Sequence, residues 1–298
     1  MTVLEAILLG IVEGITEYLP VSSTGHLILL SRALGLAETE ANRSAIDQFN
    51  IVVQGAAVLA VLGLYRNDVL AMLHAIFRWI GGIGRLPLVS TDADLRLARN
   101  LLLSFLPAAV IGKLFDEQIE QLLFGSVPVM CALAVGGVAM LLIAPAVRSR
   151  AAEPQPAAQA RPTGASLSAL AAISVGFAQC IAMVPGTSRS MVTIVAALAC
   201  GMHPREAARY SFLLALPTLG GACIYKGSKM LATGGSVELL GGWVPIGLGL
   251  VAALVSAVVS VRWLVGFLGR GGFALFGWWR IALAAIVGTA LLQGWIAR

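Results

Sequence analysis

Six apolar segments dominate the chain, and each is long enough to cross a lipid bilayer. They cover residues 47–65, 97–114, 126–147, 208–226, 243–264 and 275–296. A membrane-spanning helix needs about 20 mostly apolar residues. Only 12% of the residues are charged, about half of the roughly 25% share of a soluble domain, so a soluble fold has too little polar surface. The sequence therefore predicts an all-α polytopic membrane protein with six transmembrane helices.

Two further apolar segments are interrupted near their middle. Residues 3–34 contain YLPVSSTGH, and residues 167–200 contain MVPGTSRS. Pro and Gly beside Ser and Thr end one short helix and start another. Each half is too short to cross a bilayer alone, and irregular backbone at membrane depth survives only where protein or a watery cavity surrounds it. Both segments are therefore predicted to be re-entrant helix–loop–helix hairpins with loops near the midplane.

The two interrupted segments resemble each other. GIVEGITEYLPVSSTG begins at Gly10 and GFAQCIAMVPGTSRS begins at Gly176, so that Glu13 corresponds to Gln179. Each half of the chain contains one hairpin and three spans. Because three is odd, the second half enters the membrane upside down. This pattern predicts an inverted repeat whose two loops meet near the midplane and form a site.

The repeats divide one integral membrane domain, residues 1–298, into three parts. The first repeat covers residues 1–147 and the second covers residues 167–298, while the Pro/Ala-rich residues 148–166 form a cytoplasmic linker. Lys and Arg gather in 66–96, 148–166, 201–209 and 262–274, and fewer lie in the opposite loops. The positive-inside rule then places the N-terminus outside.

Glu13 and Glu17 lie inside the first apolar segment, four residues apart on one helix face. A carboxylate at the centre of a spanning helix costs about 2.5 kcal/mol or more. Alternatively, this helix end reaches the water interface and both carboxylates are solvated. Like charges repel, so a divalent cation with oxygen ligands would neutralise the pair and also bind phosphate. Glu13 and Glu17 are therefore candidate metal ligands and catalytic residues.

Directly after the acidic pair come Ser22, Ser23, Thr24, Gly25 and His26. Ser23 and His26 are about one helical turn apart and are predicted to act as nucleophile and proton-transfer partner. Alternatively, His26 attacks phosphorus itself. The hydroxyls of Ser22 and Thr24 and the backbone at Gly25 are candidate substrate contacts, although any one hydroxyl can simply cap a helix.

The second interruption offers small residues, hydroxyls and one guanidinium. Gly186, Thr187 and Ser188 are candidate substrate contacts, because amides at the start of a helix point at an anion. Arg189 stays charged at physiological pH and binds phosphate with a planar fork, which makes it a candidate catalytic residue. The alternative for Arg189 is a structural ion pair with one of the two glutamates.

Several other polar residues lie in apolar runs. Gln54 and Gln179 are predicted to form interhelical hydrogen bonds, with substrate contact as the alternative. Lys113 and Arg280 lie near segment ends and are expected to extend their charged groups to the membrane surface.

No nucleotide-binding motif is found, and the basic residues are too scattered for a nucleic-acid-binding face. Acids, hydroxyls and an arginine inside a membrane protein favour phosphoryl chemistry on a lipid without ATP. A secondary transporter or lipid flippase is the alternative, because inverted repeats are common in transporters. The Ser–x–x–His pair favours an enzyme, since transport does not require it.

These motifs resemble those of the undecaprenyl-diphosphatase family, also called the bacitracin-resistance protein family. EGITEYLPVSSTGH, residues 13–26, is similar to its first motif, and PGTSRS, residues 185–190, to its second. Weaker similarities are at Gln54-Gly55, Leu106–Ala109 and Arg205–Pro217. Met191 departs from the pattern, because the family usually has Gly there.

The resemblance implies an enzyme of the bacterial plasma (inner) membrane whose N-terminus and active site face the periplasm. Such an enzyme hydrolyses the C55 polyprenyl diphosphate to the monophosphate and inorganic phosphate, which recycles the lipid carrier of peptidoglycan synthesis and confers bacitracin resistance. It also implies a divalent cation, Mg²⁺ or Ca²⁺, and leaves a homodimer open. The family's functional residues map onto Glu13, Glu17, Ser23, His26, Ser188 and Arg189.

Overall fold

The computed structural model of the 298-residue chain describes residues 1–36, 39–82, 92–123, 125–153, 164–233 and 235–294. Within these ranges every regular element is a helix. The α-helices are α1 (Val3–Thr16), α2 (Ser23–Ala33), α3 (Glu40–Leu64), α4 (Arg66–Gly81), α5 (Ala93–Leu123), α6 (Ser126–Ala152), α7 (Ala169–Cys180), α8 (Arg189–Ala199), α9 (Pro204–Thr233), α10 (Gly235–Leu239), α11 (Trp243–Leu268) and α12 (Phe273–Leu292). A 3₁₀ turn, Ile181–Met183, follows α7.

Six helices of the described part are long and apolar enough to cross a membrane, as the sequence predicted. They are α3, α5, α6, α9, α11 and α12. Helix α3 begins earlier than its apolar run, because the side chain of Thr39 accepts a hydrogen bond from the amide of Asn42 and caps the helix. The all-helical class and the number of spans are therefore confirmed.

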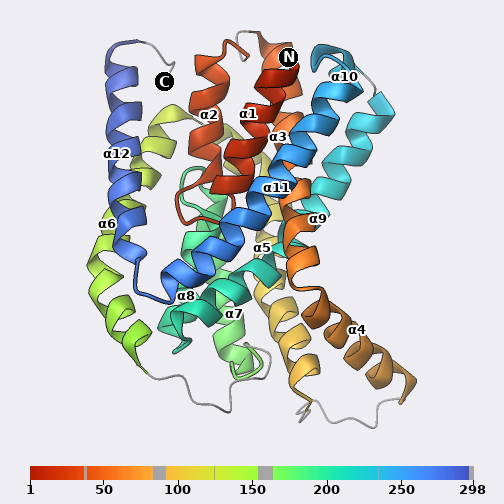
Figure 1. The fold of residues 1–298 in the computed structure, drawn as a ribbon, viewed down its shortest axis with the longest axis vertical. Coiled ribbons are helices and arrows are strands. Elements are labelled where there is room, and N and C mark those ends of the chain that lie inside the picture. Colours follow the sequence, from red (N-terminus) through yellow and green to blue (C-terminus); the bar gives the residue numbers. More distant parts are fainter. Residues whose placement is uncertain (37–38, 83–91, 124, 154–163, 234, 295–298) are drawn as a thin grey trace.

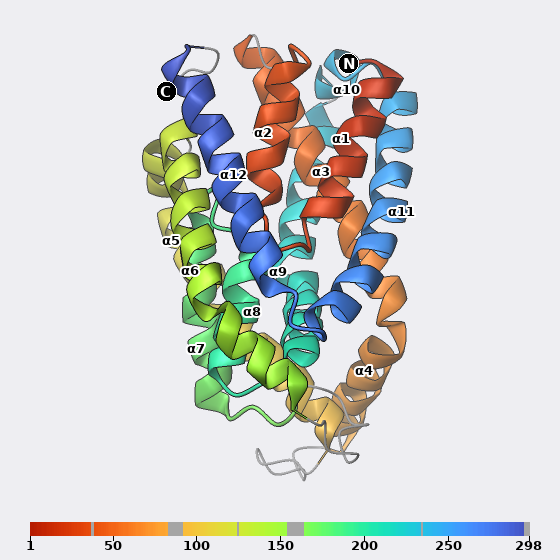
Figure 2. The same ribbon diagram turned by 60° about the vertical axis from the view of Figure 1, so that its left-hand side comes forward.

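The two interrupted segments form helix–loop–helix hairpins, α1–α2 and α7–α8 (Figure 1). They enter the bundle from opposite ends, and their connecting loops lie in its interior, as the turned view also shows (Figure 2). The first loop is residues 17–22 and contains Pro20; the second loop is residues 184–188 and contains Pro185 and Gly186. The observed arrangement is compatible with the predicted re-entrant hairpins.

Corresponding positions of the two hairpins share their packing and backbone geometry. A Cβ at Gly10 of α1 would lie 2.3 Å from the carbonyl oxygen of Gly249 in α11, and one at Gly176 of α7 would lie 2.7 Å from that of Ser104 in α5. Each hairpin thus uses a glycine to approach the backbone of a spanning helix closely. The two halves of the chain are built alike at these positions, which supports the predicted repeat.

Candidate active site

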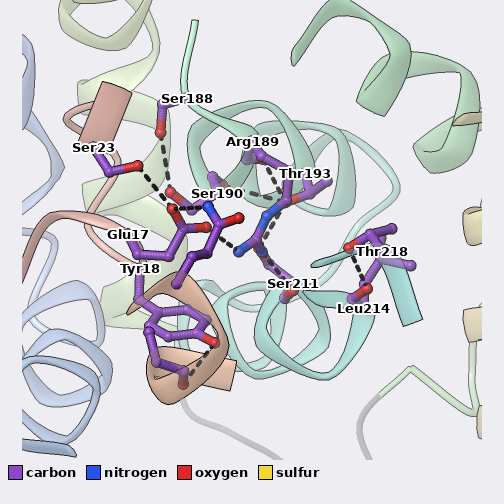
Figure 3. A network of polar contacts seen from close by, with 12 residues as sticks. Glu17, Tyr18, Ser23, Ser188, Arg189, Ser190, Thr193, Ser211, Leu214 and Thr218 are labelled. Atoms are coloured by element: carbon purple, nitrogen blue, oxygen red, sulfur yellow. Dashed lines mark hydrogen bonds and ion pairs between the residues drawn. The ribbon is translucent and has the colours of Figure 1, made fainter. Parts of the chain in front are cut away.

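Glu17, the first residue of the first loop, is the centre of a polar network where the two loops meet (Figure 3). Its Oε2 accepts hydrogen bonds from Ser23 Oγ at 2.7 Å and from Gln54 Nε2 at 3.0 Å. Its Oε1 accepts one from Arg189 Nη2 at 2.9 Å, which forms a buried ion pair. One carboxylate therefore joins the start of α2, the middle of α3 and the start of α8.

The guanidinium of Arg189 is held on two further sides. Its Nη1 donates to the carbonyl oxygen of Ser211 in α9 at 3.1 Å, and its central carbon lies 5.6 Å from the ring centre of Tyr18. The hydroxyl of Tyr18 in turn donates to the carbonyl oxygen of Ala57 in α3 at 3.0 Å. Tyr18 was not singled out from the sequence. A cation over an aromatic face in a desolvated site is attracted by the ring, so Tyr18 fixes the position of this charge.

Ser22 and Ser188 precede α2 and α8 and have the same unusual backbone geometry. Both have φ of 73°, and in the described chain they are the only residues other than glycine with positive φ. Such a conformation costs about 1–3 kcal/mol and is concentrated at functional sites. The sequence offset between these serines equals that between Gly10 and Gly176, so both halves present the start of a helix in the same way.

The two helix starts differ in how they are capped. Ser188 Oγ accepts a hydrogen bond from the amide of Met191, whereas the Ser22 side chain makes no capping bond. Ser190 Oγ donates to the carbonyl oxygen of Leu19 in the first loop at 3.0 Å and also contacts Ser188 Oγ at 3.0 Å. The second loop is thereby tied to the first, while the first-turn amides of α2 keep the partial positive charge that suits an anion.

Glu13 lies one helical turn before Glu17, with the amide of Gln54 nearby. The residue is 1% exposed, and neither of its carboxylate oxygens accepts a hydrogen bond. Its electrostatic neighbours are Glu17, Gln54 and Arg189. Orphaned carboxylate oxygens beside a second carboxylate suit a hard divalent cation. The described residues contain no cluster of three or more His, Cys, Asp or Glu side chains, so a cation here would take further ligands from water or phosphate.

His26 is oriented by two contacts outside this network. Its Nδ1 lies 2.7 Å from the carbonyl oxygen of Ser22, and its Nε2 accepts a hydrogen bond from Trp279 Nε1 of α12 at 2.9 Å. We therefore assign the ring proton to Nδ1. Ser23, predicted to work with His26 as its proton-transfer partner, donates its hydroxyl to Glu17 here. The proton acceptor next to Ser23 is thus a carboxylate.

Among the other predicted substrate contacts, Thr24 lies at the start of α2 and Thr187 lies in the second loop. Thr24 is partly exposed in the first turn of α2, and Thr187 is buried in the second loop. Gly25 instead packs against Leu133 of α6, with 3.4 Å between the leucine Cδ1 and a Cβ built on the glycine. That distance is an ordinary van der Waals contact, so packing leaves room for a Cβ at this position, and substrate contact by Gly25 stays a prediction.

The two glutamines have different partners. Gln54 donates to Glu17, so its hydrogen bond joins α3 to the end of α1 and belongs to the network, while substrate contact stays a prediction. Gln179 is buried in α7, where its Nε2 lies 3.5 Å from the carbonyl oxygen of Ser104 in α5. That contact is interhelical, as expected for a polar side chain between packed helices.

The prediction that Arg280 reaches the membrane surface is wrong. The residue is 0% exposed, and its guanidinium donates to carbonyl oxygens of the loops and of α6. Lys113, given the same role, is exposed. Nearness to the end of an apolar segment was a poor guide, because α12 passes the loops at Arg280. The available signal was an arginine inside an apolar run, which marks a functional position by default.

Fold and site together define a polytopic helical membrane protein with a buried Glu–Arg–Ser centre between two helix–loop–helix hairpins. The chain belongs to the family described as bacitracin resistance protein BacA, whose family model matches residues 6–286.

Three curated relatives, each named undecaprenyl-diphosphatase, match almost end to end. The protein of Novosphingobium aromaticivorans is 41% identical over 300 residues, covering 99% of this chain and 98% of the relative. One from Cereibacter sphaeroides is 39% identical, with 98% of each chain covered. One from Pseudomonas putida is 36% identical, covering 99% of this chain and 96% of the relative. The similarity thus includes both hairpins and all six spans.

Proposed function

We propose that the chain is an undecaprenyl-diphosphate phosphatase, which hydrolyses the C55 polyprenyl diphosphate to the monophosphate and inorganic phosphate. The observation that carries the proposal is the 2.7 Å hydrogen bond from Ser23 Oγ to Glu17, beside the guanidinium of Arg189. A nucleophile (Ser23), a base (Glu17) and a guanidinium suited to phosphate (Arg189) thus lie together in a membrane protein. The names of the relatives support the same activity.

In the proposed mechanism, Ser23 Oγ attacks the terminal phosphorus while Glu17 accepts its proton. The anhydride P–O bond breaks, and the polyprenyl monophosphate leaves. Water then attacks the phosphoserine, and Ser23 recovers its proton from Glu17 as inorganic phosphate departs. Arg189 stabilises the charge that spreads over the transferring phosphoryl group. His26 orients the start of α2 through its contacts with Ser22 and Trp279.

A transporter or flippase is the competing function. Purified protein in detergent, where no vectorial step exists, is expected to release phosphate from a polyprenyl diphosphate in the presence of Mg²⁺ or Ca²⁺. Colorimetric phosphate detection measures this reaction, with the Ser23→Ala variant as the inactive control. Absence of release by the correctly folded protein would favour transport. No contact in the described structure favours that alternative.

A divalent cation, Mg²⁺ or Ca²⁺, is part of the proposal, and the carboxylates of Glu13 and Glu17 would hold it. When bound, it supplies positive charge that neutralises the diphosphate. Its support is chemical: the buried, unpartnered oxygens of Glu13 are the hard donors that such ions prefer.

Glu13→Gln tests the cation site. We expect the Mg²⁺ concentration for half-maximal phosphate release to rise about 10–100-fold, because one charged ligand is lost. Titration of activity with Mg²⁺ measures the shift. Glu5→Gln is the matched control on the same helix, since Glu5 forms a capping box with Thr2 at the start of α1. An unchanged Mg²⁺ requirement in Glu13→Gln would remove Glu13 from the site.

We further propose that the protein lies in the bacterial plasma membrane, with the N-terminus and the open end of the first hairpin facing the periplasm. The basic residues support this orientation, because the end of α6, with Arg148 and Arg150, and the start of α9, with Arg205, lie at the opposite end of the bundle (Figure 1). A homodimer stays a prediction.

Single cysteines test the orientation. In a background with the four native cysteines replaced, we expect a membrane-impermeant maleimide to label Ala41→Cys in intact spheroplasts. Ala152→Cys should react only after the membrane is permeabilised. Both residues are exposed, at the start of α3 and the end of α6. The reverse labelling pattern would invert the proposed topology.

A further inference from the structure

Arg280 of α12 contacts both loops with one guanidinium. Its Nη2 donates to the carbonyl oxygen of Gly186 in the second loop at 2.9 Å, and its Nη1 lies 3.5 Å from that of Pro20 in the first loop. Nη2 also donates to the carbonyl oxygen of Ala132 in α6 at 2.9 Å. Three segments distant in sequence are therefore joined at a side chain that is fully buried.

The two loop contacts occupy corresponding positions in the repeat. Pro20 lies two residues before Ser22, and Gly186 lies two residues before Ser188. Those serines are the two with φ of 73° that start α2 and α8. Arg280 therefore holds both loops just ahead of their strained residues, which in turn precede Ser23 and Arg189.

The surroundings of Arg280 are shaped for a guanidinium. A Cβ on Gly136 of α6 would lie 2.3 Å from Nη2, so any larger residue would displace the charged group. Among the described residues no carboxylate lies within ion-pair distance of Arg280. A buried cation without a counter-ion is costly, and here backbone carbonyls take the place of the anion. The planar fork reaches several acceptors at once, which a lysine ammonium on a flexible stem does not reproduce.

We propose that Arg280 is a positioning residue for the proposed phosphoryl transfer. It acts through the backbone of both loops, and so keeps both Ser23 and Arg189 in contact with the carboxylate of Glu17. This inference rests on the proposed function for its kinetic consequence. The holding of two loops by one side chain does not depend on which reaction the site performs.

The first test uses hydrogen–deuterium exchange and therefore needs no activity. In Arg280→Gln we expect amide exchange to become faster in residues 17–22 and 184–188 together, because both loops lose the same anchor. Arg150→Gln is the matched control: Arg150 also donates to a backbone carbonyl, that of Leu198, but at the far end of α8. Unchanged exchange in either loop would overturn the proposal.

The second test is kinetic. We expect Arg280→Lys and Arg280→Gln to lower kcat for phosphate release by about 100-fold, the effect of displacing reacting groups by about 1 Å. KM should stay close to wild type, and kcat should fall at temperatures well below the unfolding temperature of each variant. Millimolar guanidinium should partly restore Arg280→Ala, whereas methylammonium should not. Wild-type kcat, or a loss that follows the unfolding temperature without rescue, would overturn the proposal.

Gly136→Ala keeps the test decisive if the Arg280 variants do not fold. It displaces the guanidinium without removing its charge, and we expect the same fall in kcat and the same loosening of both loops. Gly247→Ala in α11 is the matched control, because a Cβ there meets no atom within 4 Å. Wild-type kcat and exchange in Gly136→Ala would overturn the proposal. Absence of phosphate release by the wild type would instead contradict the proposed function, leaving the exchange experiment to decide on Arg280.

Discussion

Ser23→Ala is expected to lower kcat for phosphate release by about 10⁶-fold, as loss of a serine nucleophile does in other enzymes. The reason is geometric: Ser23 Oγ already donates to Glu17 at 2.7 Å, so its proton has an acceptor when the oxygen attacks. KM should change little, because Arg189 and the helix amides still bind the diphosphate. Steady-state phosphate release measures both constants.

The control for Ser23→Ala is Ser174→Ala, which removes a hydroxyl that donates to Leu170 within α7. It should behave like wild type. The covalent intermediate separates Ser23 from His26: substrate labelled in the terminal phosphate should leave acid-stable label on wild-type protein quenched during turnover. Acid-labile, alkali-stable label together with full activity in Ser23→Ala would make His26 the nucleophile.

The two hairpins were predictable because their causes are local. Pro20, Pro185 and Gly186 interrupt apolar runs, and a serine directly precedes each new helix, Ser22 before α2 and Ser188 before α8. Helix breaks depend on residues within a few positions of each other, so a single sequence contains the information. The six spans were predictable for the same reason, since length and apolarity are read directly from each segment.

The partners inside the site were less predictable, because they depend on which side chains the fold brings together. The one-turn spacing of Ser23 and His26 indicated a pair, yet Glu17 takes the Ser23 hydroxyl and Trp279 of α12 takes His26 Nε2. Spacing along one helix shows which side chains are close to each other, but not which hydrogen-bond partner each of them takes. A carboxylate within reach is a stronger hydrogen-bond acceptor than an imidazole nitrogen. Whether Glu17, at the end of α1, comes within reach of Ser23 depends on how the loop between α1 and α2 folds.

For Arg189, the structural interpretation, an ion pair with a glutamate, and the functional one, phosphate binding, are compatible. The sequence offered an ion pair with a glutamate as the alternative to phosphate binding, and the structure contains the pair with Glu17. Removing one partner of a buried pair leaves an uncompensated charge, so each of these two side chains needs an opposite charge beside it. A diphosphate brings negative charge of its own, and the guanidinium then has a second anion to bind. Under the proposed function, the Glu17–Arg189 pair is the arrangement of the site before the diphosphate binds.

Arg189→Lys should lower kcat/KM by about 10³-fold, because a lysine cannot stabilise the transferring phosphoryl group with a planar fork. The chain offers a closely matched control in Arg209, which pairs with Asp68 and has its guanidinium carbon 5.7 Å from the ring centre of Tyr65. Arg189 has the same kind of neighbours in Glu17 and Tyr18.

Arg209→Lys therefore removes the same fork from a more exposed pair of the same composition, outside the loops, and should keep wild-type kcat/KM. Kinetics of phosphate release and thermal unfolding, measured on both variants, compare the two sites. Equal losses of activity in both would attribute the effect of Arg189 to general destabilisation. A large loss in Arg189→Lys alone, at an unchanged unfolding temperature, assigns the guanidinium to the phosphate, because Ser23 lies beside the Arg189 pair and the unchanged unfolding temperature removes the greater burial of that pair as the cause.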